Sequence, residues 1–526
     1  MHFKNIIAVA LSVLLIACGG GEDTVAAPGE ASRQQDVFRT PSRAALPAVT
    51  ATQTQILVSS DPGDWVGNGG DYAYTQATAA IRVTASGGAL SVDIQGDENW
   101  RANFVLPASH GKVTPGTFNN VTRWPFHEPA VGGMDWSGEG RGCNELIGAF
   151  RVNSSEYVGA ELVAVDLDFV QHCEGDAPAL FGNIRWFAND PTVPPGPMRN
   201  VPDRLWSPAP DATPATGTFV YLESAPSDFV GDAKQYTYTP RNSHLSVTQA
   251  NGALSVGLNG DEWWTGNFKA MNVVSRVRPG WYRDLQRWPF HNPVKGGLDW
   301  SGDGRGCNQL VGWFAVDEIT YVNGQLATLD MRFEQRCQDV PWLVGPLRGR
   351  IRWDANDSAT PPGPRRIPER LWEPQDGATP AAGNYVYLAS SPGDYIGGGS
   401  KQTYTTGLSV TANQRALEIR AGGYTGNFVA MDSIPRLKRG FYPGLQRWPF
   451  HNAALGGMNW SGNGRGCNQL TGWFAVDQIR YDALGLLMAL DMRFAQRCEN
   501  VNPPLFGEVH WARPAPALQR GRPPTR

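Results

Sequence analysis

The chain lacks several features that would mark common classes of protein. No long segment carries the apolar period of an amphipathic helix, which argues against an α-helical or α/β body. The formal net charge of the 526 residues is −4 and there is no basic stripe, which argues against a nucleic-acid-binding protein. Apart from one short run near the start, no apolar stretch is long enough to cross a bilayer. These absences favour a β-rich body that lies outside the membrane.

The start of the chain has the pattern of a bacterial lipoprotein signal. An apolar run over residues 6–16 follows Lys4 and leads into Leu-Ile-Ala-Cys, which ends at Cys18. The run is too short for a stable membrane anchor and is typical of a signal peptide. Its resemblance to the lipobox predicts cleavage before Cys18 and acylation of that thiol. The alternative is an ordinary secretory peptide with an incidental cysteine.

Gly19 follows the cysteine where an aspartate would favour retention in the inner membrane, so by analogy with enteric bacteria we expect a lipid-anchored protein of the outer membrane. The segment that follows is rich in small and polar residues and cannot form a core, so it is interpreted as a tether. We therefore expect the body to be exposed to the periplasm or the cell surface.

Six of the seven cysteines fall into pairs that recur in three copies of one module. Export permits disulfides, so these pairs are expected to be bridges within modules rather than metal ligands. The predicted pairs are Cys143/Cys173, Cys307/Cys337 and Cys467/Cys498. The organisation we expect is a signal peptide at 1–17, the lipidated cysteine and tether at 18–52, β-modules at 53–190, 216–357 and 382–513, Pro-rich linkers at 191–215 and 358–381, and a basic Pro-rich tail at 514–526.

Short alternating runs and dense glycine and proline predict the fold. Asn251-Gly252 separates two strand-like runs, and Asn323-Gly324 lies near the middle of the interval between Cys307 and Cys337. An Asn-Gly hairpin there would bring the two cysteines together at its open end. The sequence therefore predicts an all-β protein of three tandem, disulfide-braced antiparallel modules, each a β-sandwich or barrel-like. The Leu-Trp pair in each linker, ending at Trp206 and Trp372, is expected to dock on an adjacent module.

Two catalytic arrangements fail when the copies are compared. Ser137, His127 and Asp135 could form a nucleophilic triad, but the third copy has Asn459 in place of the aspartate. The adjacent carboxylates at 97–98 and 261–262 could suggest glycosidase chemistry, but the third copy has two glycines at 422–423. We therefore expect a protein without enzymatic activity.

No motif predicts a resident metal or cofactor in every module. Calcium is a candidate in module 1 alone, where Asp61, Asp64 and Asp71 crowd one turn. Because Asp64 recurs as Asp228 and Asp394 while its acidic neighbours do not, a turn-capping role is favoured for this position.

Aromatic and polar residues that recur in every copy form the candidate binding surface. A flat aromatic ring can stack on the C–H groups of a sugar while arginine, asparagine, aspartate and histidine bind its hydroxyl groups. A packing role in the core is the alternative for each tryptophan. The candidates are Asn103, Arg123, Trp124, His127, Trp136 and Arg141 in module 1; Asn267, Arg287, Trp288, His291, Asp299, Trp300 and Arg305 in module 2; and Asn427, Arg447, Trp448, His451, Trp460 and Arg465 in module 3.

Four motifs occur in the same order in the modules. They are Ser-Pro-Gly-Asp-Tyr-Ile-Gly from Ser391, Leu-Gln-Arg-Trp-Pro-Phe-His-Asn at 445–452, Ser-Gly-x-Gly-Arg-Gly-Cys-Asn before each hairpin, and Phe-Glu-Gln-Arg-Cys at 333–337. Together they resemble a secreted bacterial β-module that occurs singly and in tandem in envelope proteins. The resemblance implies export and a modular β architecture, and it implies no particular activity.

The sequence thus favours a non-enzymatic lipoprotein whose modules bind an extracellular or envelope polymer, with a glycan as the first choice. The alternative is a structural or protein-interaction lipoprotein of the envelope in which the same aromatic residues are core. The expected partners are the membrane, through the lipid, and a glycan or an envelope protein; nucleic acid is not expected.

Overall fold

The computed structural model describes residues 38–39, 52–175, 178–338, 345–499 and 503–513. The predicted signal peptide, Cys18, most of the tether and the basic tail lie outside these residues. The described part is built from β-strands and contains no helix that is long and apolar enough to cross a bilayer.

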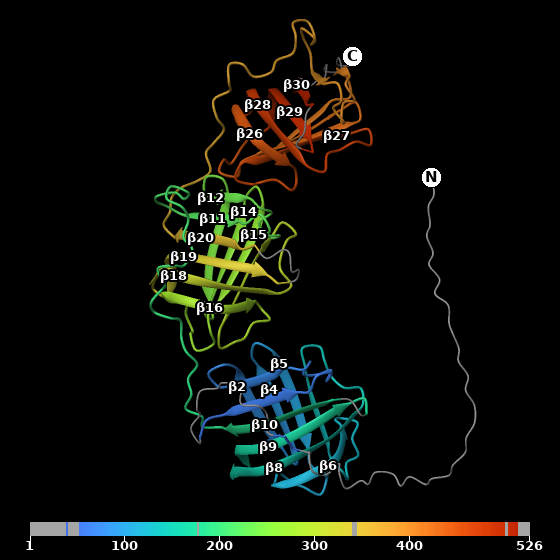
Figure 1. Cartoon of the computed structure of the whole chain (residues 1–526). Helices are drawn as coiled ribbons and strands as arrows, with labels where there is room; N and C mark the ends of the chain where they lie inside the picture. The colour runs from blue at the N-terminus through green and yellow to red at the C-terminus, as the bar shows by residue number, and fades with distance from the viewer. Residues whose placement is uncertain (1–37, 40–51, 176–177, 339–344, 500–502, 514–526) are drawn as a thin grey trace, which may run out of the picture.

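In the described residues thirty strands form three ten-stranded sheets, one for each predicted module, and the modules follow one another in a row (Figure 1). Module 1 contains β1 (Gln55–Ser60), β2 (Asp71–Thr75), β3 (Ala80–Ser86), β4 (Ala89–Gln95), β5 (Asn99–Val105), β6 (Gly116–Arg123), β7 (Gly133–Gly138), β8 (Leu146–Val158), β9 (Glu161–Cys173) and β10 (Ala179–Phe187). Module 2 contains β11 (Phe219–Ser224), β12 (Gln235–Tyr238), β13 (His244–Ala250), β14 (Ala253–Asn259), β15 (Trp263–Lys269), β16 (Gly280–Arg287), β17 (Gly297–Gly302), β18 (Leu310–Val322), β19 (Gln325–Cys337) and β20 (Leu347–Asp354). Module 3 contains β21 (Tyr385–Ser390), β22 (Lys401–Tyr404), β23 (Ser409–Asn413), β24 (Ala416–Ala421), β25 (Tyr424–Ala430), β26 (Gly440–Arg447), β27 (Gly456–Gly462), β28 (Leu470–Tyr481), β29 (Leu487–Cys498) and β30 (Leu505–Ala512).

Each sheet curls into a barrel-like module, which confirms the predicted all-β, tandem architecture. The strand order in module 1 is β2-β1-β10-β9-β8-β6-β7-β5-β4-β3, and the other two modules repeat it. The paired strands are antiparallel except at one place in each module; in module 1, β6 pairs with β7 in parallel over two residues. Parallel neighbours normally need a long crossover. Here the loop at 124–132 suffices because the parallel contact is so short.

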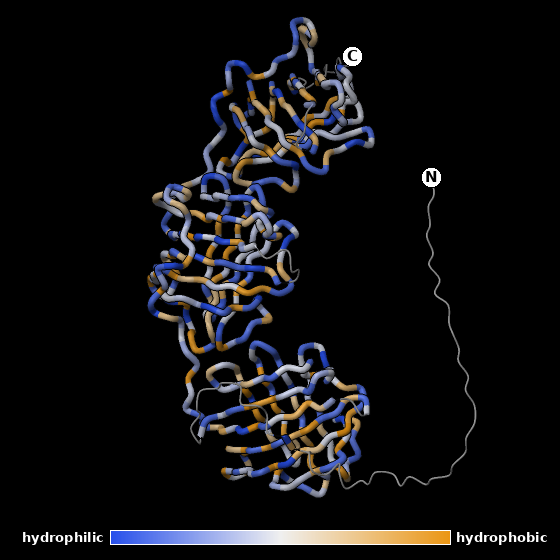
Figure 2. The backbone as a smooth tube through the Cα atoms, in the orientation of Figure 1, coloured by the Kyte–Doolittle hydropathy of each residue, from blue (hydrophilic) through white to orange (hydrophobic). Residues whose placement is uncertain are grey.

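The interior of each module is filled by one face of every strand, as Figure 2 shows by the alternation of hydrophobic and hydrophilic residues along the strands. In β19 the side chains of Leu329, Met331 and Phe333 are buried in the core. Asp330, between them, points outward and forms an ion pair with Arg350 of the neighbouring strand. This period of two is that of a strand with one face in the core and the other outside.

The disulfide-bridged hairpins form as predicted. β18 and β19 are joined at Asn323-Gly324, where both residues have the positive φ that a tight hairpin turn requires. Leu310 pairs with Cys337, so the cysteines lie at the open end of the hairpin. The bridges join Cys143 to Cys173, Cys307 to Cys337 and Cys467 to Cys498.

The linkers pack on the modules that follow them. Trp206 stacks on Tyr221 at a ring-centroid distance of 6.5 Å, and Trp372 stacks on Phe506 at 4.8 Å. Arg332 and its counterpart in module 3 donate hydrogen bonds to the backbone carbonyls of these tryptophans. The predicted docking is thereby confirmed for the tryptophan of each pair, and each linker is attached to the next module.

Candidate functional site

One surface recurs on the outside of every module, in the loop that joins the two parallel strands. We call it the Trp-Phe surface. It consists of Arg123, Trp124, Phe126 and His127 in module 1, Arg287, Trp288, Phe290 and His291 in module 2, and Arg447, Trp448, Phe450 and His451 in module 3.

Backbone contacts fix the shape of this loop. In module 2 the Trp288 N–H donates to the carbonyl of Leu298 at 3.0 Å, and the Phe290 N–H donates to the carbonyl of Arg287 at 2.9 Å. The Trp288–Pro289 peptide bond is cis, as are its equivalents in the other modules. The aromatic side chains therefore project from a defined turn rather than from an open loop.

The aromatic rings of this surface face solvent. The three tryptophans are 36–37% exposed and the three phenylalanines are 69–77% exposed. The guanidinium group of the preceding arginine lies over each phenylalanine ring, at 5.2–5.5 Å from its centroid. A cation over the ring face is attractive and holds the ring in place. Each module thus presents an ordered apolar ring to the outside.

The histidine packs beneath this loop against a glycine. A side chain at Gly297 would place its Cβ 2.6 Å from the His291 ring, and the same conflict would arise in the other modules. Burial, together with the charge of Lys269, lowers the pKa of His291, and burial also lowers the pKa of His451. These two imidazoles are therefore neutral at neutral pH.

A polar row crosses the outer face of the strands beside the loop. In module 2 Asn267 lies opposite Asp299, whose carboxylate accepts from Ser301 at 3.0 Å and lies 3.7 Å from Arg287. Burial raises the pKa of Asp299 despite the opposing effects of Ser301 and Arg287. Module 1 repeats this arrangement with Asn103 and Asp135, whereas in module 3 the corresponding pair is Asn427 and Asn459. The structure thus brings the predicted Asn267, Arg287 and Asp299 together, and His291 packs on Gly297 beneath the adjoining loop.

The predicted binding role was wrong for three tryptophans. Trp136, Trp300 and Trp460 are 0% exposed and point into the barrel cores. Each follows an outward residue of the polar row by one position, so the alternation of the strand turns it inward. A buried glutamine, such as Gln335 in module 2, bonds both the N–H and the carbonyl of this tryptophan. These indoles belong to the core and not to a ligand surface.

Each module has a second arginine among the predicted binding residues, and this arginine lies away from the Trp-Phe surface. Arg305 lies beyond the far end of β17, where its Nε donates to the carbonyl of Val230 at 2.7 Å and its guanidinium covers Trp264. Arg141 makes the equivalent contacts in module 1, and Arg465 donates to the carbonyl of Tyr395. These arginines attach the opening turn of the module to the barrel, so they are not part of the Trp-Phe surface.

The proposed calcium turn in module 1 is held by hydrogen bonds. Asp64 accepts from the Ser60 hydroxyl at 2.7 Å and from the backbone N–H groups of Val66 and Gly67. Asp228 and Asp394 repeat this pattern. In the described ranges no group of three or more histidine, cysteine, aspartate or glutamate side chains is arranged to hold a metal ion. The geometry supports the turn-capping interpretation at this position.

The structure also reveals exposed aromatics that the sequence analysis did not single out. Trp65, Phe229 and Tyr395 occupy equivalent positions in the opening turns and are 63%, 46% and 57% exposed. The sequence feature that could have identified them is that every copy has an aromatic residue directly after the capping aspartate, although the residue is a tryptophan, a phenylalanine or a tyrosine. The phenylalanines of the Trp-Phe surface were likewise quoted within a repeated motif but were not named as candidate binding residues.

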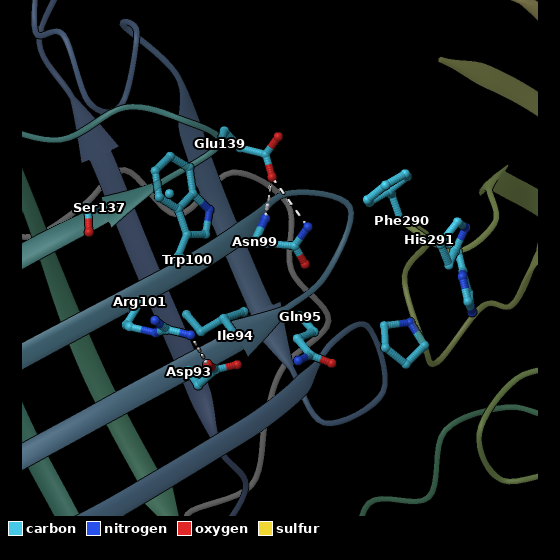
Figure 3. Close-up of a pocket in the computed structure, with 13 residues that line it drawn as sticks. Asp93, Ile94, Gln95, Asn99, Trp100, Arg101, Ser137, Glu139, Phe290 and His291 are labelled. Atoms are coloured by element: carbon cyan, nitrogen blue, oxygen red, sulfur yellow. Dashed lines mark hydrogen bonds and ion pairs between the residues drawn. The ribbon is translucent and has the colours of Figure 1, made fainter. Parts of the chain in front are cut away.

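A cleft of about 560 Å³ separates the Trp-Phe surface of module 2 from module 1. Phe290 and His291 lie across it from Gln95 and Asn99 of the β4–β5 hairpin, as Figure 3 shows. Asp93, Arg101 and Glu139 supply charged groups to the wall on the side of module 1. The cleft combines a ring face with hydrogen-bonding groups from two modules, an arrangement suited to binding a polar ligand that has apolar faces.

Comparisons with known proteins add little to this description. No protein-family model and no curated protein matches the chain. Among solved structures, a protein of unknown function from the DUF3598 family of Nostoc punctiforme matches 57% of this chain and 94% of its own length. The identity is 9% and the TM-score is 0.12, and at this level the similarity carries no argument.

Proposed function

We propose that the chain is an outer-membrane lipoprotein whose three β-modules bind an extracellular or envelope polymer, most consistently a glycan, without catalysing a reaction. The observation that supports this proposal is the Trp-Phe surface. The same solvent-facing pair of rings, held by the same arginine, recurs in all three modules. A ring that served only to fill the core would be buried, as Trp300 is.

The chemistry of the surface favours sugar over other polymers. The exposed rings offer flat apolar faces, and the adjacent asparagine, arginine and aspartate offer donors and acceptors for hydroxyl groups. Three such surfaces on one chain raise the avidity for a repetitive ligand even where each contact is weak.

The polymer proposal is tested with the full chain in detergent on a panel of glycans and envelope polymers. Replacing Trp124, Trp288 and Trp448 together with alanine is expected to weaken binding to the identified polymer at least about tenfold, since each ring contributes about 0.5–1.5 kcal/mol and the losses combine over linked modules. Binding is measured by surface plasmon resonance on the immobilised polymer.

Two control variants locate the surface. Leu484→Ala changes a side chain that is 95% exposed in the distal hairpin of module 3 and should leave binding unchanged. Trp65→Ala removes a ring of the opening turn and reports whether that region contributes as well. Full binding by the triple variant, or no binding by the wild type across the panel, would favour the structural alternative, to which the docked linkers are suited.

The membrane anchor is a separate part of the proposal and rests on the signal at the start of the chain. Cys18→Ala is expected to abolish incorporation of labelled palmitate and to release the protein from the outer-membrane fraction. Unchanged labelling of the variant would exclude Cys18 as the lipid attachment site.

A further inference from the structure

The turn between β4 and β5 of module 1 reaches into module 2. The Asp97 carboxylate accepts from the Asn292 amide at 2.9 Å and from the Lys295 ammonium at 2.6 Å. The carbonyl of Asp97 accepts from the Gln286 amide at 3.0 Å. Asn292 also donates to the carbonyl of Thr78 in module 1, at 2.8 Å.

The junction between modules 2 and 3 repeats the asparagine and glutamine contacts, while Leu455 occupies the position of Lys295. Asn452 donates to the Asp261 carboxylate at 2.9 Å and to the carbonyl of Asn242 at 2.8 Å. Gln446 donates to the carbonyl of Asp261 at 3.0 Å. The repetition of these contacts at two junctions indicates a built docking site rather than an incidental contact between neighbours.

The asparagine at the centre of each junction is buried. Asn292 and Asn452 are each 1% exposed, and their backbone N–H groups donate to Gln286 and Gln446 at 3.1 Å. A buried amide needs hydrogen-bond partners, and a carboxylate is a stronger acceptor than a neutral group. The aspartate of the preceding module therefore completes a site that its neighbour prepares.

Each outer module lacks one half of the site: module 3 lacks the aspartate turn, and module 1 lacks the asparagine and glutamine. In module 3 the turn is three residues shorter: Ala421 pairs with Tyr424 across Gly422-Gly423, whereas the equivalent pair of module 1, Ile94 and Trp100, encloses five residues that include Asp97. In module 1 the asparagine and glutamine are replaced by Glu128 and Thr122. A glutamate at the asparagine position would repel an incoming aspartate.

We propose that the aspartate turn and the asparagine loop form a head-to-tail docking surface whose partner is another module of this type. The chain carries both halves only at its internal junctions, so its two ends do not join to a second copy. This inference is independent of polymer binding, because it concerns contacts between modules.

The first test measures the junction in the full chain. Spin labels at Val158→Cys and Val322→Cys, on exposed hairpin tips of modules 1 and 2, report their separation by pulsed electron resonance. Asp97→Ala is expected to broaden the narrow distance distribution. Asp93→Ala, whose ion pair with Arg101 stays within module 1, is the matched control and should not broaden it. An Asp97→Ala distribution as narrow as that of the wild type would overturn the proposal.

The second test transfers the missing halves to the ends. One variant carries Thr122→Gln and Glu128→Asn, and the other replaces Gly422-Gly423 with the five residues of the module 1 turn, Gln-Gly-Asp-Glu-Asn. Each alone should stay monomeric in sedimentation velocity, whereas an equimolar mixture should dimerise at concentrations near about 1 mM, the effective concentration of a tethered module. A mixture that stays monomeric at this concentration would show that these residues do not determine whether two chains join end to end.

Discussion

Replacing Trp300 with alanine is expected to destabilise module 2 by about 3–5 kcal/mol, the usual effect of deleting a buried tryptophan. Its indole is fully buried and stacks on Phe333 at a centroid distance of 5.1 Å. The surrounding barrel strands are held by their ladders and cannot collapse into the space. Calorimetry of the full chain should show one module melting early, with the other two transitions retained.

Trp288→Ala is the matched control, because this ring belongs to the same module but lies on the exposed Trp-Phe surface. It should leave the melting profile close to that of the wild type. If Trp300→Ala melted like the wild type and yet lost polymer binding, the assignment of this ring to the core would be wrong.

The contrast between these two tryptophans shows where sequence reasoning was insufficient. Both recur in every copy, so repetition alone could not tell an exposed ring from a buried one. The distinction depends on the strand register, which turns Asp299 outward and Trp300 inward. The register becomes certain only once the neighbouring strands are placed. The position of Arg305 was missed for the same reason, since its partners come from the opening turn about 75 residues earlier.

Features set by local chemistry were predicted well. The Asn323-Gly324 turn fixes the register of its hairpin, and that register places Cys337 at the open end near Cys307. The all-β class followed from composition and alternation. The junctions could not be predicted this way, because Asp97 and Asn292 are 195 residues apart and each lies in a motif that looks complete within its own module. The sequence shows that copy three lacks the acidic turn, but the role of this turn in docking becomes apparent only when the neighbouring module is in place.

Replacing Cys307 with serine should destabilise module 2 by about 3–4 kcal/mol, because the bridge closes a loop with a sequence separation of 30 and restricts the unfolded chain. Both sulfurs are buried, so the serine hydroxyl gains no solvent contact to offset the loss. The melting temperature of module 2 should fall by about 10 °C for a domain of this size. Calorimetry under non-reducing conditions measures the shift.

The double variant Cys307→Ser/Cys337→Ser removes the free thiol as a source of aggregation and should show the same fall. Modules 1 and 3 keep their own bridges, so their transitions should move little if each barrel unfolds as its own cooperative unit. A simultaneous fall of all three transitions would contradict this expectation. It would mean that the Asp97–Asn292 and Asp261–Asn452 junctions couple the barrels strongly enough for the row to unfold as one body.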